Sequence, residues 1–166
     1  MAAGLYTLTL AGSGTGGFRF DDVIGNNSTT GTLALAVNTN ANSLVTLGAA
    51  NTFTGGVTLT QGILGLGSSS ALGTGTVTIN GGQLGSLSSE RFLANPFVVN
   101  SNFTLGGVDK ATTINGAVDL GGGTRTITLG NSATINGVVS NGGLIINGSN
   151  AGSVRRFTLS GTNTYG

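Results

Sequence analysis

The chain of 166 residues contains no cysteine, no histidine and no tryptophan, and only 7% of its residues are charged. Without cysteine it cannot form a disulfide framework or a thiolate metal site. Without histidine it lacks the commonest general base, so its many serines have no imidazole to activate them. These absences predict a protein with no catalytic residue, no metal site and no cofactor.

The low charge narrows the possible partners. Six basic and five acidic residues give a net charge of +1, whereas binding to nucleic acid needs clustered Lys and Arg. No run of 18 apolar residues is present, so we expect no membrane-spanning segment. Residues 1–4 lack the features of a signal peptide, and we expect the targeting signal and the translocator to lie outside this sequence. The cysteine-free, charge-poor composition still favours an extracellular protein over a cytosolic one.

The chain is rich in Gly, Thr, Ser and Asn, which surround short apolar triplets with the period of a β-strand. One series consists of Phe18–Phe20, Leu35–Val37, Val57–Leu59, Val77–Ile79, Phe97–Val99, Val118–Leu120, Val138–Val139 and Phe157–Leu159, and its step is nearly constant from Val57 onward. A second series interleaves with it at a similar step and includes Leu44–Val45, Ile63–Leu64, Leu84, Phe103–Leu105, Ile127–Leu129 and Leu144–Ile146. Two series with one period predict an all-β parallel solenoid with about 20 residues per coil and roughly eight coils.

The two outer residues of each triplet should point inward, because side chains alternate along a strand. This alternation predicts a core column of Val57, Leu59, Val77, Ile79, Phe97, Val99, Val118, Leu120, Phe157 and Leu159. The middle residues should form an outer ladder of Thr58, Thr78, Val98, Asp119 and Thr158. An antiparallel β-sandwich with strands every 8–12 residues is the alternative fold. The one candidate helix is Ser88–Ala94, with a serine N-cap and Pro96 after its end.

A longer repeat is also visible, because Thr46–Phe53 returns in similar form as Thr158–Tyr165. We therefore expect residues 1–166 to be a single solenoid domain, consisting of one long repeat of about 112 residues with partial flanking copies. On this interpretation the chain is a fragment of a longer repetitive protein.

Four segments resemble the autotransporter-associated β-strand repeat of bacterial passenger regions. They are Asn51–Leu59, Gly62–Leu64, Ala71–Gly75 and Val77–Leu84. The resemblance implies a right-handed parallel β-helix outside the cell, where such repeats help the passenger to cross the outer membrane and form a stalk. We therefore expect a non-catalytic stalk or passenger segment of a cell-surface protein. Its expected partners are copies of itself or adjacent repeats, joined end to end by strand stacking into filaments.

Three other functions remain open at this stage. An adhesin would need exposed aromatic side chains, for which the candidates are Phe18, Phe20, Phe92 and Tyr165. A carbohydrate-active β-helix enzyme would need clustered carboxylates, and Asp21–Asp22 beside Arg19 or Asp119 near Lys110 and Arg125 are the possible clusters. An ice-binding solenoid would need flat Thr-x-Thr arrays, such as Thr58–Thr60 and Thr76–Thr78.

Overall fold

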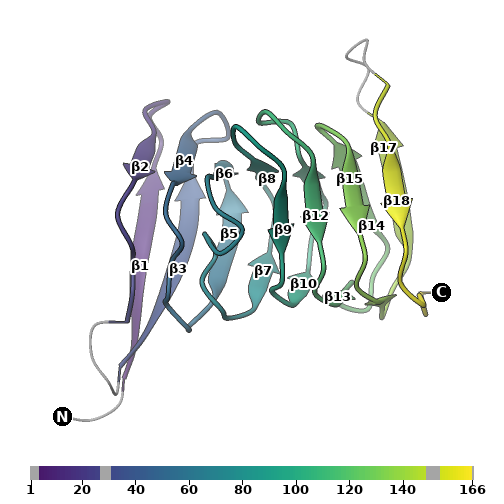
Figure 1. Cartoon of the computed structure of the whole chain (residues 1–166), viewed down its shortest axis with the longest axis horizontal. Helices are drawn as coiled ribbons and strands as arrows, with labels where there is room; N and C mark the ends of the chain where they lie inside the picture. The colour runs from purple at the N-terminus through teal and green to yellow at the C-terminus, as the bar shows by residue number, and fades with distance from the viewer. Residues whose placement is uncertain (1–3, 27–30, 149–153, 166) are drawn as a thin grey trace.

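The computed structural model of the chain describes residues 4–26, 31–148 and 154–165. These residues form an elongated all-β rod, with the first and last strands at opposite ends (Figure 1). No helix occurs among them, so none there is long and apolar enough to cross a membrane.

Three parallel sheets run along the rod. Sheet A contains seven strands in chain order: β1 (Leu5–Gly12), β3 (Thr32–Thr39), β5 (Val57–Gln61), β7 (Val77–Ile79), β10 (Phe97–Val99), β13 (Val118–Asp119) and β16 (Val139–Ser140). Sheet B contains β2 (Phe18–Phe20), β4 (Leu44–Leu47), β6 (Ile63–Leu66), β8 (Gln83–Ser86), β11 (Phe103–Leu105), β14 (Arg125–Leu129) and β17 (Leu144–Gly148). Sheet C contains only β9 (Arg91–Leu93), β12 (Thr112–Ile114), β15 (Ala133–Ile135) and β18 (Phe157–Leu159).

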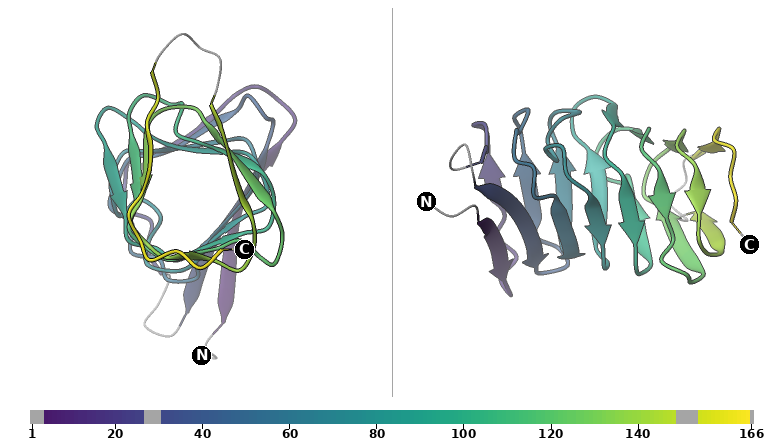
Figure 2. Two further views of the ribbon diagram at one scale, coloured as in Figure 1. Left: turned by 90° about the vertical axis from the view of Figure 1, so that its right-hand side faces the viewer. Right: turned by 90° about the horizontal axis from the view of Figure 1, so that it is seen from below.

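The chain passes from sheet A to sheet B, and in the C-terminal coils to sheet C, before it returns to sheet A. Seen from the C-terminal end, this path turns counterclockwise as it approaches the viewer, so the coil is right-handed (Figure 2). Val57, Val77, Phe97 and Val118 pair across successive coils, as their spacing in the sequence predicts. The predicted right-handed parallel β-helix is therefore confirmed. Sheets A and B each contain seven strands, where roughly eight coils were expected.

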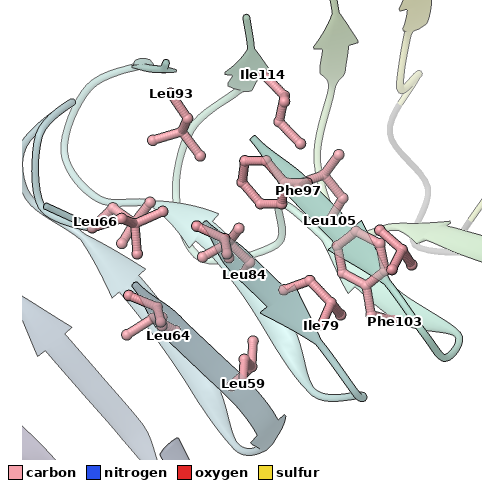
Figure 3. Packing of buried hydrophobic residues seen from close by; sticks show 14 of the residues in the cluster. Leu59, Leu64, Leu66, Ile79, Leu84, Leu93, Phe97, Phe103, Leu105 and Ile114 are labelled. Carbon is pink, nitrogen blue, oxygen red and sulfur yellow. The ribbon is translucent and has the colours of Figure 1, made fainter. Parts of the chain in front are cut away.

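Side chains from all three sheets meet in the interior. Leu84 from sheet B, Phe97 from sheet A and Leu93 from sheet C point into the same core (Figure 3). In sheet A the inward column is buried and comprises Val57, Leu59, Val77, Ile79, Phe97, Val99, Val118 and Leu120. The middle residues of these triplets are partly exposed, as the alternation along a strand requires.

Phe18–Phe20 lies in sheet B and not with the Val57 series, so its predicted place is wrong. Phe157 and Leu159 do not belong to the sheet A column either, and their predicted place is also wrong. They lie in sheet C, where Phe157 pairs with Ala133 and Leu159 with Ile135. The sheet A position of their coil is near Thr164, which forms a parallel bridge with Ser140. This last coil is longer than the coils between Val57 and Val139. A step of the usual length from Val138 therefore ends at Phe157 in sheet C, before the chain has returned to sheet A.

The valine pair Val138–Val139 is shifted by one residue from the prediction. Val139 pairs with Val118 and is fully buried, whereas Val138 is 40% exposed. A one-residue slip turns each side chain to the other face of the sheet. Either valine fits the hydrophobic pattern, and the pairing with Val118 shows that Val139 is the inward one.

The predicted helix Ser88–Ala94 is also wrong. It contains strand β9, which pairs with β12, and Ser88 has a φ of 59°, outside the range of a right-handed helix. Leu93 is buried there against the core. Tertiary packing thus overrides a weak local preference for helix.

Sheet C is absent from the first three coils of the described chain, where asparagine side chains join the backbones instead. Asn51 accepts a hydrogen bond from the Ile24 N–H (2.8 Å) and donates to the Ala71 carbonyl (2.6 Å). Asn95 donates to the carbonyls of Gly73 (3.1 Å) and Gly75 (2.8 Å). These amides bridge neighbouring coils where strand pairing is missing.

Candidate functional site

The outer face of sheet A carries Asp119, which follows directly on the buried Val118. Its carboxylate accepts hydrogen bonds from the Gly121 N–H and from the Asn141 side chain, both at 2.7 Å. The Gly121 N–H and, to a lesser extent, Asn141 lower the pKa of Asp119. Both bonds favour the ionised form, so this aspartate is a turn-stabilising acceptor and a poor proton donor.

The basic residues proposed to cluster with Asp119 bind elsewhere. Arg125 donates from Nε to the carbonyls of Val99 (3.0 Å) and Leu120 (2.9 Å). Lys110 forms a backbone bridge with Ser86, and no ion pair between its side chain and Asp119 occurs among the described residues. In the described part of the chain, the structure therefore does not assemble this carboxylate–cation cluster.

Arginines satisfy backbone carbonyls at three places, which sequence reasoning missed. Besides Arg125, Arg91 donates to the carbonyls of Leu66 (3.3 Å) and Leu87 (3.2 Å). Arg155 donates to the Leu129 carbonyl at 2.9 Å. A guanidinium has several donors in a fixed fork, which suits it to carbonyls of adjacent coils. No simple sequence pattern marks these contacts, because each partner lies in another coil or across a turn.

The second predicted cluster is a simple surface pair. Arg19 Nε lies 2.8 Å from Asp21 Oδ2, and both side chains are exposed. This hydrogen bond raises the pKa of the Arg19 guanidinium. Across the described residues, no group of three or more acidic side chains could hold a metal ion.

The outward column of sheet A does not form a continuous threonine array. It reads Thr9, Ala36, Thr58, Thr78, Val98, Asp119 and Ser140. Two threonines are adjacent, and the residues on either side of them lack the hydroxyl and methyl pair of threonine. This arrangement does not favour the ice-binding alternative.

A hollow lies on the side of the rod where sheet C begins. Its volume is about 350 Å³, and its lining includes Asn51, Thr54, Ser70 and Asn95. Phe92, one of the aromatic candidates, is 52% exposed on the adjoining strand β9, and its N–H donates to Ser69 Oγ in the hollow's lining. This is the lateral surface that best combines an aromatic ring with hydrogen-bonding groups.

The two ends of the rod carry most of the exposed apolar surface. Of nine large exposed hydrophobic residues in the described chain, seven lie in the first or the last coil: Leu5, Tyr6, Phe18, Val23, Ile145, Val154 and Tyr165. Phe20 at one end and Phe157 at the other are partly buried against the core. The ends also present the outer edges of β1 and β2, and of β17 and β18.

An edge strand offers backbone N–H and C=O groups for pairing with another strand. Apolar surface and strand edges therefore coincide at both ends of the described rod, where the strands of a further coil could pair. No family model, no curated protein and no solved structure matches this chain.

Proposed function

We propose that this chain is a non-catalytic structural segment, of the stalk or passenger kind, in an exported bacterial cell-surface protein. The observation that carries the proposal is the unbroken stacking of sheets A and B, with a continuous core, from the first described coil to the last. Such a rod holds whatever is joined to its ends at a fixed separation.

The location outside the cell is supported by composition and by the repeat-like segments. The chain has no cysteine, little charge and many Thr, Ser and Asn residues. Its Asn51–Leu59 segment resembles a repeat of secreted passenger regions. Each coil contacts only its neighbours, so a solenoid of this kind can fold progressively as it emerges from a membrane.

The experiment is surface labelling of the source bacterium with antibodies against the purified chain. We expect intact cells to be labelled, and we expect external protease to remove the label while a cytosolic marker survives. Labelling that requires permeabilised cells would contradict the proposal.

An adhesin segment is the second candidate, and the observation that favours it is the exposed Phe92, whose N–H donates to Ser69 in the lining of the hollow. An exposed aromatic ring is suited to stack on a sugar or on an extended peptide. Comparing the wild-type chain and Phe92→Ala for binding to host cells or matrix glycans would test this function. Equal binding by both proteins would exclude a role for this surface.

A further inference from the structure

The hollow where sheet C begins has an exposed aromatic ring at its rim. Phe92 and Leu93 end strand β9, and Ala94, the next residue, is part of the lining. Leu93 is buried in the core (Figure 3), whereas Phe92 and Ala94 are exposed, so these two side chains share the outer face. The Phe92 N–H also donates to Ser69 Oγ in the lining. The ring therefore lies next to the hollow on two counts.

This ring is free over about half of its surface. Of the nine large exposed hydrophobic residues in the described chain, only Phe92 and Val138 lie outside the first and the last coil. Phe92 is 52% exposed, so it contributes less to the core than the buried phenylalanines do. Its exposed surface is available to a ligand that has an apolar face.

Asn95 gives the hollow an acceptor without a donor. The residue is 4% exposed and belongs to the lining. Its side-chain nitrogen donates to the carbonyls of Gly73 and Gly75, which fixes the orientation of the amide. No described residue donates a hydrogen bond to Asn95 Oδ1. Because a mostly buried acceptor is costly when it is unpaired, a donor that enters the hollow gains a hydrogen bond there.

The other polar side chains of the lining are neutral. Thr52, Ser70 and Thr74 are exposed, and their hydroxyls form no hydrogen bond with another described residue. Each hydroxyl can both donate and accept. Among the described residues, none that lines the hollow is charged. The lining therefore suits a neutral ligand that carries hydroxyls of its own, and it offers no opposite charge to an ion.

The edge of β9 does not suit an extended peptide. Such a peptide would join the sheet by pairing with the free backbone groups of its edge strand. Phe92 is the middle residue of this three-residue strand, and its N–H is already bonded to Ser69 Oγ at 3.1 Å. The other edge of β9 pairs with β12. A peptide strand could therefore add here only by breaking the bond to Ser69.

We infer that this hollow binds a neutral sugar, with the flat face of a pyranose ring on Phe92 and sugar hydroxyls bonded to Asn95 Oδ1 and Thr74. Its volume of about 350 Å³ is in the range of small-molecule sites and holds about one or two sugar rings. The inference names the ligand class of the adhesin candidate and rests on that candidate, whereas the structural role of the rod does not depend on it.

The test is saturation-transfer NMR of the whole chain with three groups of probes. The first group contains neutral di- and trisaccharides of glucose, galactose, mannose and N-acetylglucosamine. The second contains acidic oligosaccharides with uronic or sialic acid, and the third contains extended Thr-Val peptides. We expect transfer to at least one neutral sugar, and weaker or no transfer to the other two groups. The dissociation constant of the best neutral sugar is then measured by titration.

Variants locate the binding. Phe92→Ala should weaken it at least about fivefold, and Phe92→Tyr, which keeps the ring, should preserve it. Phe18→Ala is the matched control, because Phe18 is also partly exposed but lies on β2 in the first coil. Thr74→Val keeps the shape of the side chain and removes its hydroxyl, so it should weaken binding about twofold or more. Thr76→Val, at an exposed residue outside the lining, should have no effect.

Three outcomes would overturn the inference: no binding of any neutral sugar, equal or stronger binding of acidic sugars or peptides, or binding that Phe92→Ala leaves unchanged. Thermal unfolding of each variant checks that the rod is intact. Host-cell binding that is lost in Phe92→Ala, without binding of any neutral sugar, would keep the adhesin candidate and reject the sugar. None of these outcomes changes the surface-labelling result, which tests the structural proposal.

Discussion

The side-chain amide of Asn136 donates a hydrogen bond to Oδ1 of Asn115, one coil earlier, at 2.9 Å. Both residues belong to the same short sequence, Thr-Ile-Asn-Gly, at 113–116 and 134–137. The corner between sheets C and A is thus built twice from the same residues, stacked one on the other. The following predictions test how much such corners, the core and the charged side chains contribute to the stability of the rod.

Asn95→Ala should destabilise the rod more than Asn136→Ala. Asn95 is buried, and its loss would leave the carbonyls of Gly73 and Gly75 without this donor. We expect a cost of about 1–3 kcal/mol for Asn95→Ala, against about 1 kcal/mol or less for the exposed Asn136→Ala. Urea denaturation of the two variants measures the difference, and equal costs would show that the buried amide has no special role.

Gly116→Ala should be among the most damaging substitutions of a small residue. A Cβ at Gly116 would overlap the Asn95 carbonyl of the neighbouring coil, and a Cβ at Gly137 would overlap the Gly116 carbonyl in the same way. Because backbone must move to admit the methyl group, we expect a loss of about 3 kcal/mol or more, or failure to fold. Gly16→Ala is the control, since no atom lies within 4 Å of a Cβ there. Thermal unfolding that is equally affected by both substitutions would contradict this close approach of the coils.

Phe97→Ala and Val98→Ala test the alternation of the sheet A triplets. Phe97 is 1% exposed, while its neighbour Val98 lies on the outer face. We expect about 3–5 kcal/mol for the loss of the buried ring, and about 1 kcal/mol or less for the outer valine. Chemical denaturation measures both costs. A larger cost at Val98 would mean that the strand is turned over.

Asp119 should make the rod sensitive to acid. The Gly121 N–H and Asn141 lower its pKa in the folded chain, so the carboxylate is more easily ionised there than in the unfolded chain. Its contribution is therefore complete above the unfolded-state pKa of about 4 and is lost as the pH falls through the lower folded value. The melting temperature of the wild type should therefore decline as the pH falls below about 4, in part because Asp119 becomes protonated. The near-isosteric Asp119→Asn should remove that part of the decline. Asp109→Asn should leave it in place. A decline that is the same in Asp119→Asn and the wild type would contradict the prediction.

The sequence was sufficient to predict the parallel solenoid and most of the sheet A column, because the triplets recur at a nearly constant step. It was not sufficient at Val138–Val139, where two adjacent valines fit the pattern equally well. The Thr-Ile-Asn-Gly of 113–116 returns at 134–137 and aligns Val118 with Val139. The same tetrapeptide at 78–81 overlaps β7 of sheet A, so the motif alone does not identify the strands of sheet C.

The candidate interaction surfaces were less predictable. The place of Phe157 was missed because the last coil, from Ser140 to Thr164, is longer than those between Val57 and Val139, and a fixed period cannot anticipate a longer coil.

The direction of the ladders has a mechanical consequence. The backbone hydrogen bonds between coils point along the axis of the rod. A pull on the two ends therefore loads one coil-to-coil junction at a time, and the coils should peel off singly while the rest of the rod stays intact. Each released coil would lengthen the chain by roughly 70 Å, since about 20 residues extend at about 3.3–3.6 Å each. Such a segment would yield under tension in steps and shorten again when the load is removed.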